Sequence, residues 1–174
     1  VELSRYEGSM GKIRTERTRL CELSELASQF FQTQLTSSQK GKEAAGYLLG
    51  RGVSEESVKT WRLGYAPGNG TSLMDFLRSR GYTANEIGRA GLCVQSGGKT
   101  YDRFRSRIMF PVFDLNSQVI GFGGRVFGEK EQEDLSKYVN TPNTPLYDKS
   151  RVLYGLDKGK LAVRKQDACV LVEG

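Results

Sequence analysis

The 174-residue sequence has no histidine, only three cysteines and only four prolines, and each scarcity limits what the chain can be. Without histidine or a CxxC pair, the chain cannot form a zinc finger or use imidazole as an acid, a base or a metal ligand. Cys21, Cys93 and Cys169 cannot all pair within one chain, which favours a reducing compartment. With 37% apolar residues, so few prolines argue against disorder.

Long apolar runs are also missing. No run approaches the roughly 20 residues that cross a bilayer, and the first residues, VELSRYEGSMGK, lack the apolar core of a signal peptide. We therefore expect a soluble, cytoplasmic protein. Its length suits one hydrophobic core rather than a long multidomain chain.

Acidic residues are in the minority and are clustered. Lysine and arginine number 26 against 20 aspartates and glutamates, a net charge of +6, which suits a polyanionic partner. Residues 99–107 hold four cations and one aspartate, whereas residues 129–134 hold four acids and one lysine. This separation of charge indicates a basic surface for nucleic acid.

The first hundred residues are predicted to be mainly helical. Residues 1–18 are polar and contain glycine and serine, which favours a linker or arm. Apolar residues then recur every three to four positions and predict an amphipathic helix over about 17–35. Stop and cap residues indicate four more helices: one ended by Gly50 and Gly52, one capped by Ser54, one stopped by Gly81 and one opened by a capping box from Thr83 to Glu86.

Strand patterns dominate after a short extended segment near residues 61–67. Residues 92–94 begin the sheet, with a Ser-Gly-Gly turn at 96–98. Residues 108–113 and 119–122 predict two antiparallel strands joined by turn residues 114–117. Residues 137–140 predict a further strand, a helix follows to about Gln166, and the apolar run 168–172 predicts a strand buried on both faces. The expected fold is mixed α/β (α+β), with N-terminal helices packed on a bent, mainly antiparallel sheet.

The stretch from Lys99 to Arg125 is the first candidate binding surface. Arg103, Arg105 and Arg107 are spaced by two, which on an extended chain puts three guanidinium groups on one face. Gly121, Gly123 and Gly124 allow a close backbone approach before Arg125. A buried hairpin with a solvated arginine edge explains the same pattern equally well. The glycines lack the GxGxxG spacing of a dinucleotide site.

The second candidate surface combines two cations, an aromatic ring and an amide within thirteen residues. Its members are Lys137, Tyr138, Asn140 and Lys149. Lysine suits phosphate, tyrosine can stack on an unpaired base, and asparagine can bond a base edge or a sugar hydroxyl. A solvated strand edge and loop is the alternative. Glu173 ends an apolar strand pattern, where α/β sheets often place functional groups, but a lone glutamate there is weak evidence and an exposed strand-end carboxylate is the more ordinary interpretation.

Three ordered motifs read DRFRSRIMFPVFDLNSQVIGFGGRV from Asp102, KYVNTPNTPLYDKSRVLYGL from Lys137 and VLVEG from Val170. Together they resemble the catalytic core of the bacterial-type DNA primases. The resemblance covers roughly residues 20–174 and is dense after Tyr101. Val139 and Tyr147 are conservative departures from the family pattern.

The resemblance implies a DNA-dependent RNA polymerase that makes short primers for replication, working with single-stranded DNA, ribonucleoside triphosphates and a replicative helicase. It implies a primase core subdomain at 19–166 and the first strand of a truncated Toprim domain at 167–174. Glu173 would be the catalytic acid beside Mg²⁺ or Mn²⁺, and zinc would belong to an N-terminal domain absent from this chain. Nucleotide and template would bind to the basic residues and their neighbours, namely Arg103, Arg105, Arg125, Lys137, Tyr138, Asn140 and Lys149.

One carboxylate cannot hold Mg²⁺ firmly, because the ion is usually held by several converging oxygens. We therefore expect the 174-residue chain alone to make no primer. The competing class is a non-catalytic module whose basic face only follows single strands or binds regulatory nucleotides.

Overall fold

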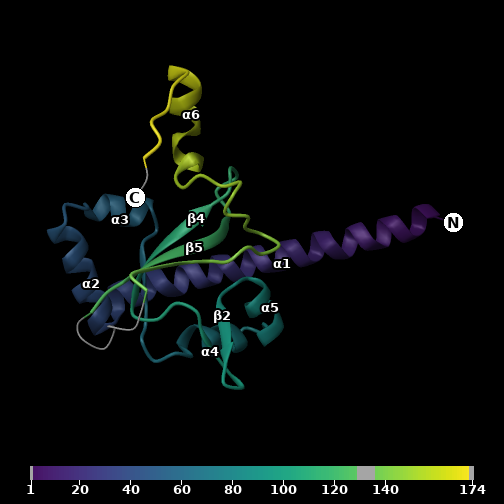
Figure 1. The fold of residues 1–174 in the computed structure, drawn as a ribbon, viewed down its shortest axis with the longest axis horizontal. Helices are drawn as coiled ribbons and strands as arrows, with labels where there is room; N and C mark the ends of the chain where they lie inside the picture. The colour runs from purple at the N-terminus through teal and green to yellow at the C-terminus, as the bar shows by residue number, and fades with distance from the viewer. Residues whose placement is uncertain (1, 129–135, 173–174) are drawn as a thin grey trace.

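The structure, a computed structural model, describes residues 2–128 and 136–172, with side chains from Glu16 onward. Five helices and six strands precede a last helix: α1 (Glu2–Ser37), α2 (Gln39–Gly50), α3 (Glu55–Thr60), β1 (Gly64–Ala66), α4 (Ser72–Arg78), α5 (Ala84–Arg89), β2 (Cys93–Ser96), β3 (Lys99–Asp102), β4 (Arg107–Phe113), β5 (Val119–Val126), β6 (Tyr138–Asn140) and α6 (Leu156–Gln166). The main sheet has the antiparallel order β1-β4-β5-β6, and Figure 1 labels its two central strands, β4 and β5. The predicted mixed fold of helices on an antiparallel sheet is confirmed.

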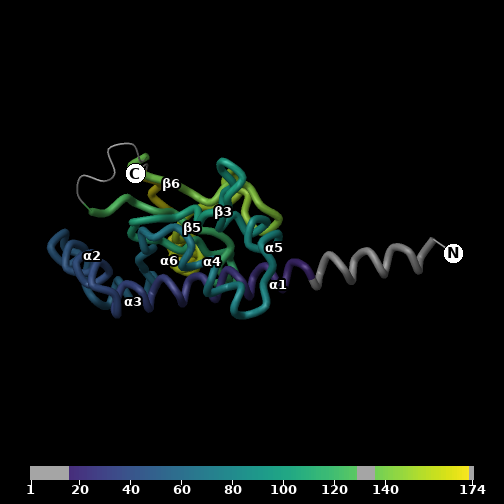
Figure 2. The backbone as a smooth tube through the Cα atoms, turned by 90° about the horizontal axis from the view of Figure 1, so that it is seen from below, coloured from purple at the N-terminus to yellow at the C-terminus, as the bar shows by residue number. Residues whose placement is uncertain are grey.

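Helix α1 covers one face of the main sheet, and Figure 2 shows it along one side of the body with β5 and β6 above it. Apolar residues recur on its inner side because a helix turns once every 3.6 residues, and Leu20, Leu23, Ala27 and Phe31 are buried there. The Phe31 ring lies 5.4 Å from that of Phe122 on β5, nearly perpendicular to it. None of the helices in the described ranges is both long and apolar enough to span a membrane.

The predicted linker or arm at residues 1–18 is corrected, because α1 begins at Glu2. The sequence contains no proline before Pro67, and isolated glycine and serine weaken a helix without ending it. The helix predicted over about 17–35 is therefore the C-terminal half of a longer one. Its end at Ser37 agrees with the prediction.

The central hairpin forms as predicted. Strands β4 and β5 pair from Arg107 with Val126 to Phe113 with Val119. The Asp114 carboxylate accepts hydrogen bonds from the backbone N–H groups of Asn116 and Gln118, and Ser117 takes a left-handed conformation at φ 60°. This local bonding closes the turn. Strands β2 and β3 form a separate two-stranded sheet joined through Gly97 and Gly98, rather than the start of the main sheet.

The predicted caps of the short helices are confirmed. Ser54 accepts a hydrogen bond from the backbone N–H of Ser57 at the start of α3. Thr83 and Glu86 form a reciprocal capping box at the start of α5. The Glu86 carboxylate is also bonded by Arg19 of α1, whose guanidinium reaches the Gly81 carbonyl at 2.9 Å. The hydrogen bonds from Arg19 and Thr83 lower the pKa of Glu86 to about 2.

Replacing Glu86 with glutamine should therefore lower stability in a pH-dependent way. A depressed carboxylate pKa contributes stability above the unfolded pKa of about 4.5 and loses it as the pH falls towards about 2. Glutamine keeps an acceptor for the capping box and removes only the charge. Urea unfolding at pH 7 and pH 3 should give a larger difference between wild type and Glu86→Gln at pH 7. An equal difference at both pH values would contradict the ionic contribution.

Helix α6 stands away from the sheet in Figure 1 and is fixed at its start by an aromatic stack. The rings of Trp61 and Tyr154 are stacked with centroids 5.3 Å apart, and Lys158 Nζ lies 4.7 Å from the ring centroid of Phe113. The helix predicted to end near Gln166 is confirmed.

The strand predicted at residues 168–172 is wrong for the described chain. These residues form no strand, and Val170 and Val172 are 89% and 87% exposed. A strand requires a neighbouring backbone for its hydrogen bonds, and an apolar sequence pattern does not supply one. No backbone hydrogen bond joins residues 168–172 to another described segment.

Candidate nucleic-acid interface

Strands β5 and β6 bring three of the predicted site residues to one face of the sheet. Arg125 lies opposite Tyr138, and Gly123 lies opposite Asn140. Directly opposed residues of an antiparallel pair point to the same face. The alternate residues of β5, Phe122 and Gly124, belong to the other face of the sheet, where Phe122 packs on α1. The face of the sheet turned away from α1 therefore carries Arg125, Tyr138 and Asn140, and we call it the β5–β6 face.

A cavity of about 310 Å³ is hollowed into the β5–β6 face. It is lined by three tyrosines and their apolar, basic and amide neighbours, namely Phe110, Val112, Gly123, Gly124, Arg125, Tyr138, Asn140, Tyr147 and Tyr154. A Cβ atom on Gly123, which lines the cavity, would lie 3.1 Å from Asn140 Oδ1, and one on the neighbouring Gly121 would lie 3.2 Å from the Tyr147 ring. The predicted close approach at these glycines is thus made by side chains of the same chain.

Arg125 is held by aromatic side chains at this cavity. Its Nη1 donates a hydrogen bond to Tyr47 Oη of α2, and its guanidinium carbon lies 5.2 Å from the Tyr47 ring centroid. The contact raises the pKa of Arg125 above its ordinary value and lowers the pKa of Tyr47. Lys137 Nζ lies 5.7 Å from the ring centroid of Tyr138. The β5–β6 face thus combines cations with an exposed aromatic ring.

The predicted alignment of Arg103, Arg105 and Arg107 on one face is wrong. Ser106 has a left-handed backbone at φ 49°, so residues 103–107 do not form a continuous strand. Arg107 is 3% exposed, and its Nη1 donates to the Lys137 carbonyl at 3.4 Å. Arg103 is half-buried, donates from Nε to the Gly91 carbonyl at 2.8 Å, and has its pKa lowered by burial.

Arg105 lies beside the β2–β3 hairpin, because Asp102 anchors this segment to α4. The buried Asp102 carboxylate accepts hydrogen bonds from the backbone N–H groups of Leu73 and Met74. The Arg105 guanidinium carbon lies 5.8 Å from the ring centroid of Tyr101 on β3. Arg105 is therefore separate from the cavity-lining residues.

Of the remaining two predicted site residues, Lys149 does not line the cavity and Glu173 is not described. Lys149 is exposed on the loop after β6, two positions from the cavity-lining Tyr147, and its backbone N–H donates to Asn143 Oδ1 at 3.2 Å. Glu173 lies outside the described residues, as does the acidic cluster at 129–134. Within residues 16–128 and 136–172, no three acidic, cysteine or histidine side chains gather closely enough to hold a metal ion.

Sequence reasoning missed several aromatic residues at this face, including Tyr47, Tyr147 and Tyr154. Tyr147 and Tyr154 lie in the same motif as Tyr138, so their proximity on the chain is a usable signal. Tyr47 is 78 residues from Arg125, within the helix that the sequence predicts to end at Gly50 and Gly52. Nothing in a helical period indicates which distant arginine a tyrosine will meet.

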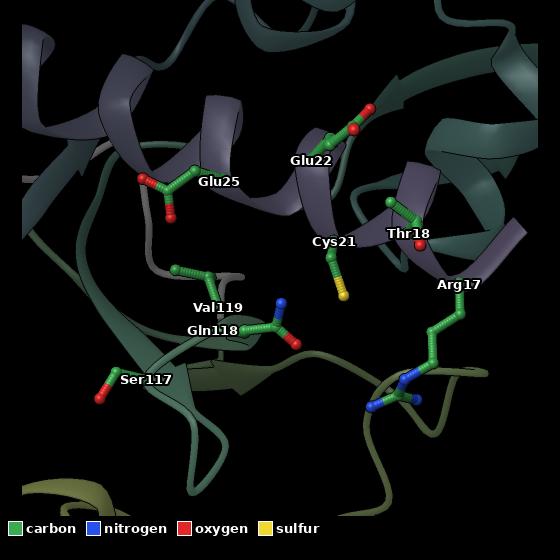
Figure 3. A pocket seen from close by; sticks show the side chains of 8 residues that line it. All are labelled: Arg17, Thr18, Cys21, Glu22, Glu25, Ser117, Gln118 and Val119. Carbon is green, nitrogen blue, oxygen red and sulfur yellow. The ribbon is translucent and has the colours of Figure 1, made fainter. Parts of the chain in front are cut away.

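A second cavity, of about 600 Å³, lies between α1 and the β4–β5 turn (Figure 3). It is lined by charged, polar and apolar groups, namely Arg17, Thr18, Cys21, Glu22, Glu25, Ser117, Gln118 and Val119. Arg62 binds both carboxylate oxygens of Glu25, at 3.0 and 2.5 Å. The lining of this second cavity has two carboxylates, Glu22 and Glu25, and one arginine, Arg17, so its charge is a poor match for a phosphate chain.

Comparison with known proteins places the chain in a family. Residues 30–160 match the family described as the DNA primase catalytic core, N-terminal domain. The DNA primase of Staphylococcus epidermidis is 37% identical over 168 residues, and that of Clostridium acetobutylicum is 41% identical over 150 residues. The alignments cover 95% and 85% of this chain but 27% and 24% of those relatives, so the chain spans about a quarter of their length.

Solved structures of primases share the fold. The RNA polymerase domain of Mycobacterium tuberculosis primase DnaG superposes with a TM-score of 0.82 at 34% identity, over 91% of this chain and 50% of that chain. A DnaG primase catalytic domain bound to ssDNA superposes with a TM-score of 0.74 at 34% identity, over 86% and 45% of the two chains. The chain therefore belongs to the family of DNA primase catalytic core N-terminal domains.

Proposed function

We propose that the β5–β6 face binds single-stranded template DNA and ribonucleotides within a primase that synthesises short RNA primers. The observation that carries the proposal is the meeting of Arg125, Tyr138 and Asn140 around an aromatic-lined cavity. The similar catalytic domain bound to ssDNA, and the M. tuberculosis domain in complex with double-stranded DNA carrying a 6-nucleotide overhang, support a nucleic-acid ligand.

The chemistry of this face suits a single strand of any sequence. An exposed tyrosine offers a stacking surface that every base can use. Arg125 and Lys137 offer positive charge to the phosphates, and the Asn140 amide offers both donors and acceptors to a sugar hydroxyl or a base edge. We assign Lys149 and Arg105 to outer contacts with the same strand. Arg103 receives a structural role, because its Nε is committed to the Gly91 carbonyl.

The divalent cation of primer synthesis would bind at Glu173, which lies outside the described residues. A divalent cation neutralises charge on the triphosphate in nucleotidyl transfer. We keep Glu173, at the start of a Toprim domain, as one of its ligands, and no step of template binding depends on the ion. A cytoplasmic location and a replicative helicase as partner belong to the same proposal.

Replacing Lys137 with alanine should weaken binding of single-stranded DNA and reduce its salt dependence. Each phosphate contact on a single strand contributes about 0.7 to the slope of log affinity against log salt. Lys137 is exposed, so its removal should leave folding unchanged. Fluorescence anisotropy with a labelled oligothymidylate at several salt concentrations measures both quantities.

Lys99→Ala is the matched control, because Lys99 is an exposed lysine on the β2–β3 hairpin. It makes the same change of charge away from the cavity and should leave the slope unchanged. If Lys99→Ala reduced the slope of log affinity against log salt and Lys137→Ala did not, the binding surface would be the β2–β3 hairpin and not the β5–β6 face.

A further inference from the structure

Tyr47 of α2 contacts Arg125 of β5 from a distant part of the chain. We propose that Tyr47 is a positioning residue, whose hydroxyl holds the Arg125 guanidinium at the cavity in the orientation that meets a phosphate. This inference rests on the function proposed above for the β5–β6 face. Tyr47 lies outside the three sequence motifs, and it would act by orienting Arg125 rather than by contacting the nucleic acid.

The Tyr47 ring is itself held in place by packing. It lies 5.5 Å from the ring of Phe127, and Phe127 meets Tyr65 edge-on at 6.3 Å. Helix α2, which carries Tyr47, is anchored by the buried side chains of Ala44 and Leu48. The hydroxyl is therefore presented from a fixed support, which a flexible surface side chain would not provide.

A phenol suits this role because it orients an arginine without neutralising it. Guanidinium has five N–H donors, and hydrogen bonds to the hydroxyls of Tyr47 and Tyr138 leave three of them for an anion. Other arginines of the chain are paired with carboxylates, Arg62 with Glu25 and Arg19 with Glu86. Within the described part of the chain, no carboxylate forms an ion pair with Arg125.

The surroundings of Tyr47 are cationic, as a phosphate site requires. The hydrogen bond from Arg125 and the nearby charges of Arg51 and Lys137 lower the pKa of Tyr47, because cations stabilise the phenolate. Anion binding to a guanidinium that is already oriented avoids the entropy loss of immobilising a long side chain, which is about 0.5 to 1.5 kcal/mol. That loss corresponds to an affinity change of about 2- to 13-fold.

Tyr47→Phe tests the proposal, since it removes the hydroxyl and keeps the ring that packs on Phe127. We expect the dissociation constant of the 174-residue chain for labelled oligothymidylate to rise about 2- to 13-fold. Arg125→Ala should also weaken binding. Adding Tyr47→Phe to Arg125→Ala should cause no further loss, because Tyr47 acts through Arg125.

Tyr82→Phe is the matched control, because the Arg19 guanidinium carbon lies 4.7 Å from the Tyr82 ring centroid at a site remote from the cavity. It should bind as wild type does. If Tyr47→Phe bound with wild-type affinity while Arg125→Ala bound more weakly, the positioning role of Tyr47 alone would be overturned. The positioning role would also be overturned if Tyr47→Phe weakened binding as much in the Arg125→Ala background as it does in the wild-type protein. Wild-type affinity of Arg125→Ala would overturn the proposed function of this face and the inference with it.

Discussion

Replacing Gly64 with alanine is expected to lower the free energy of unfolding by about 3 kcal/mol, the upper part of the range for overpacked cores. Gly64 is buried in β1, where α1 crosses the sheet. A Cβ atom there would lie 2.5 Å from Phe31 Cβ and 2.7 Å from the Phe31 carbonyl carbon. A backbone atom cannot rotate away, so α1 and β1 would have to separate, and the packing of Phe31 on Phe122 would loosen.

Gly46→Ala adds the same methyl group, but we expect it to raise the free energy of unfolding. Gly46 is exposed inside α2, and nothing lies within 4 Å of an added Cβ atom. Alanine should stabilise the helix by about 0.5 to 1 kcal/mol. Urea unfolding monitored by circular dichroism measures both variants. A Gly64→Ala protein as stable as wild type would mean that the close approach of β1 to α1 is incorrect.

Replacing Tyr138 with alanine is expected to weaken binding of single-stranded DNA by about 1 to 3 kcal/mol, the range for loss of one base–aromatic stack. This corresponds to about a 5- to 150-fold higher dissociation constant. Tyr138 is 59% exposed, so folding should be unaffected. The salt slope should stay near that of wild type, because stacking involves no phosphate.

Tyr138→Phe separates stacking from hydrogen bonding at the same position. Phenylalanine keeps the aromatic ring and loses the hydroxyl, so it should bind within a small factor of wild type. Anisotropy titrations of the three proteins at two salt concentrations are sufficient. Equal losses for the alanine and phenylalanine variants would assign the role of Tyr138 to its hydroxyl and contradict the stacking account.

The helices and hairpins were predictable because their signals are local. Ser54 and the Thr83–Glu86 capping box fix helix starts within a single turn, and Asp114 closes the β4–β5 turn from inside the turn itself. The N-terminal half of α1 was missed because polar residues without an apolar stripe resemble a linker in a sequence. The apolar run 168–172 predicted a strand that does not form, because a strand also needs a neighbouring strand, which its own residues do not specify.

The candidate site was predictable where its residues share a motif and unpredictable where they do not. Tyr138 and Asn140 are two apart on an extended strand, so a shared face followed from the period alone. The same period failed for Arg103, Arg105 and Arg107, because Ser106 turns the backbone between them. Tyr47 could not have been assigned to Arg125, since their contact depends on how α2 packs against the sheet.

The most direct test of the account is a chemical-shift titration of the ¹⁵N-labelled chain with oligothymidylate. The account predicts that the largest amide shifts occur in β5 and β6, around Arg125, Tyr138 and Asn140, with smaller shifts near Tyr147. The tip of the β2–β3 hairpin, from Ser96 to Lys99, and the cavity between α1 and the β4–β5 turn should shift little. Shifts centred on Arg17 and Gln118, with β5 and β6 unchanged, would contradict the central claim that the β5–β6 face holds the single strand.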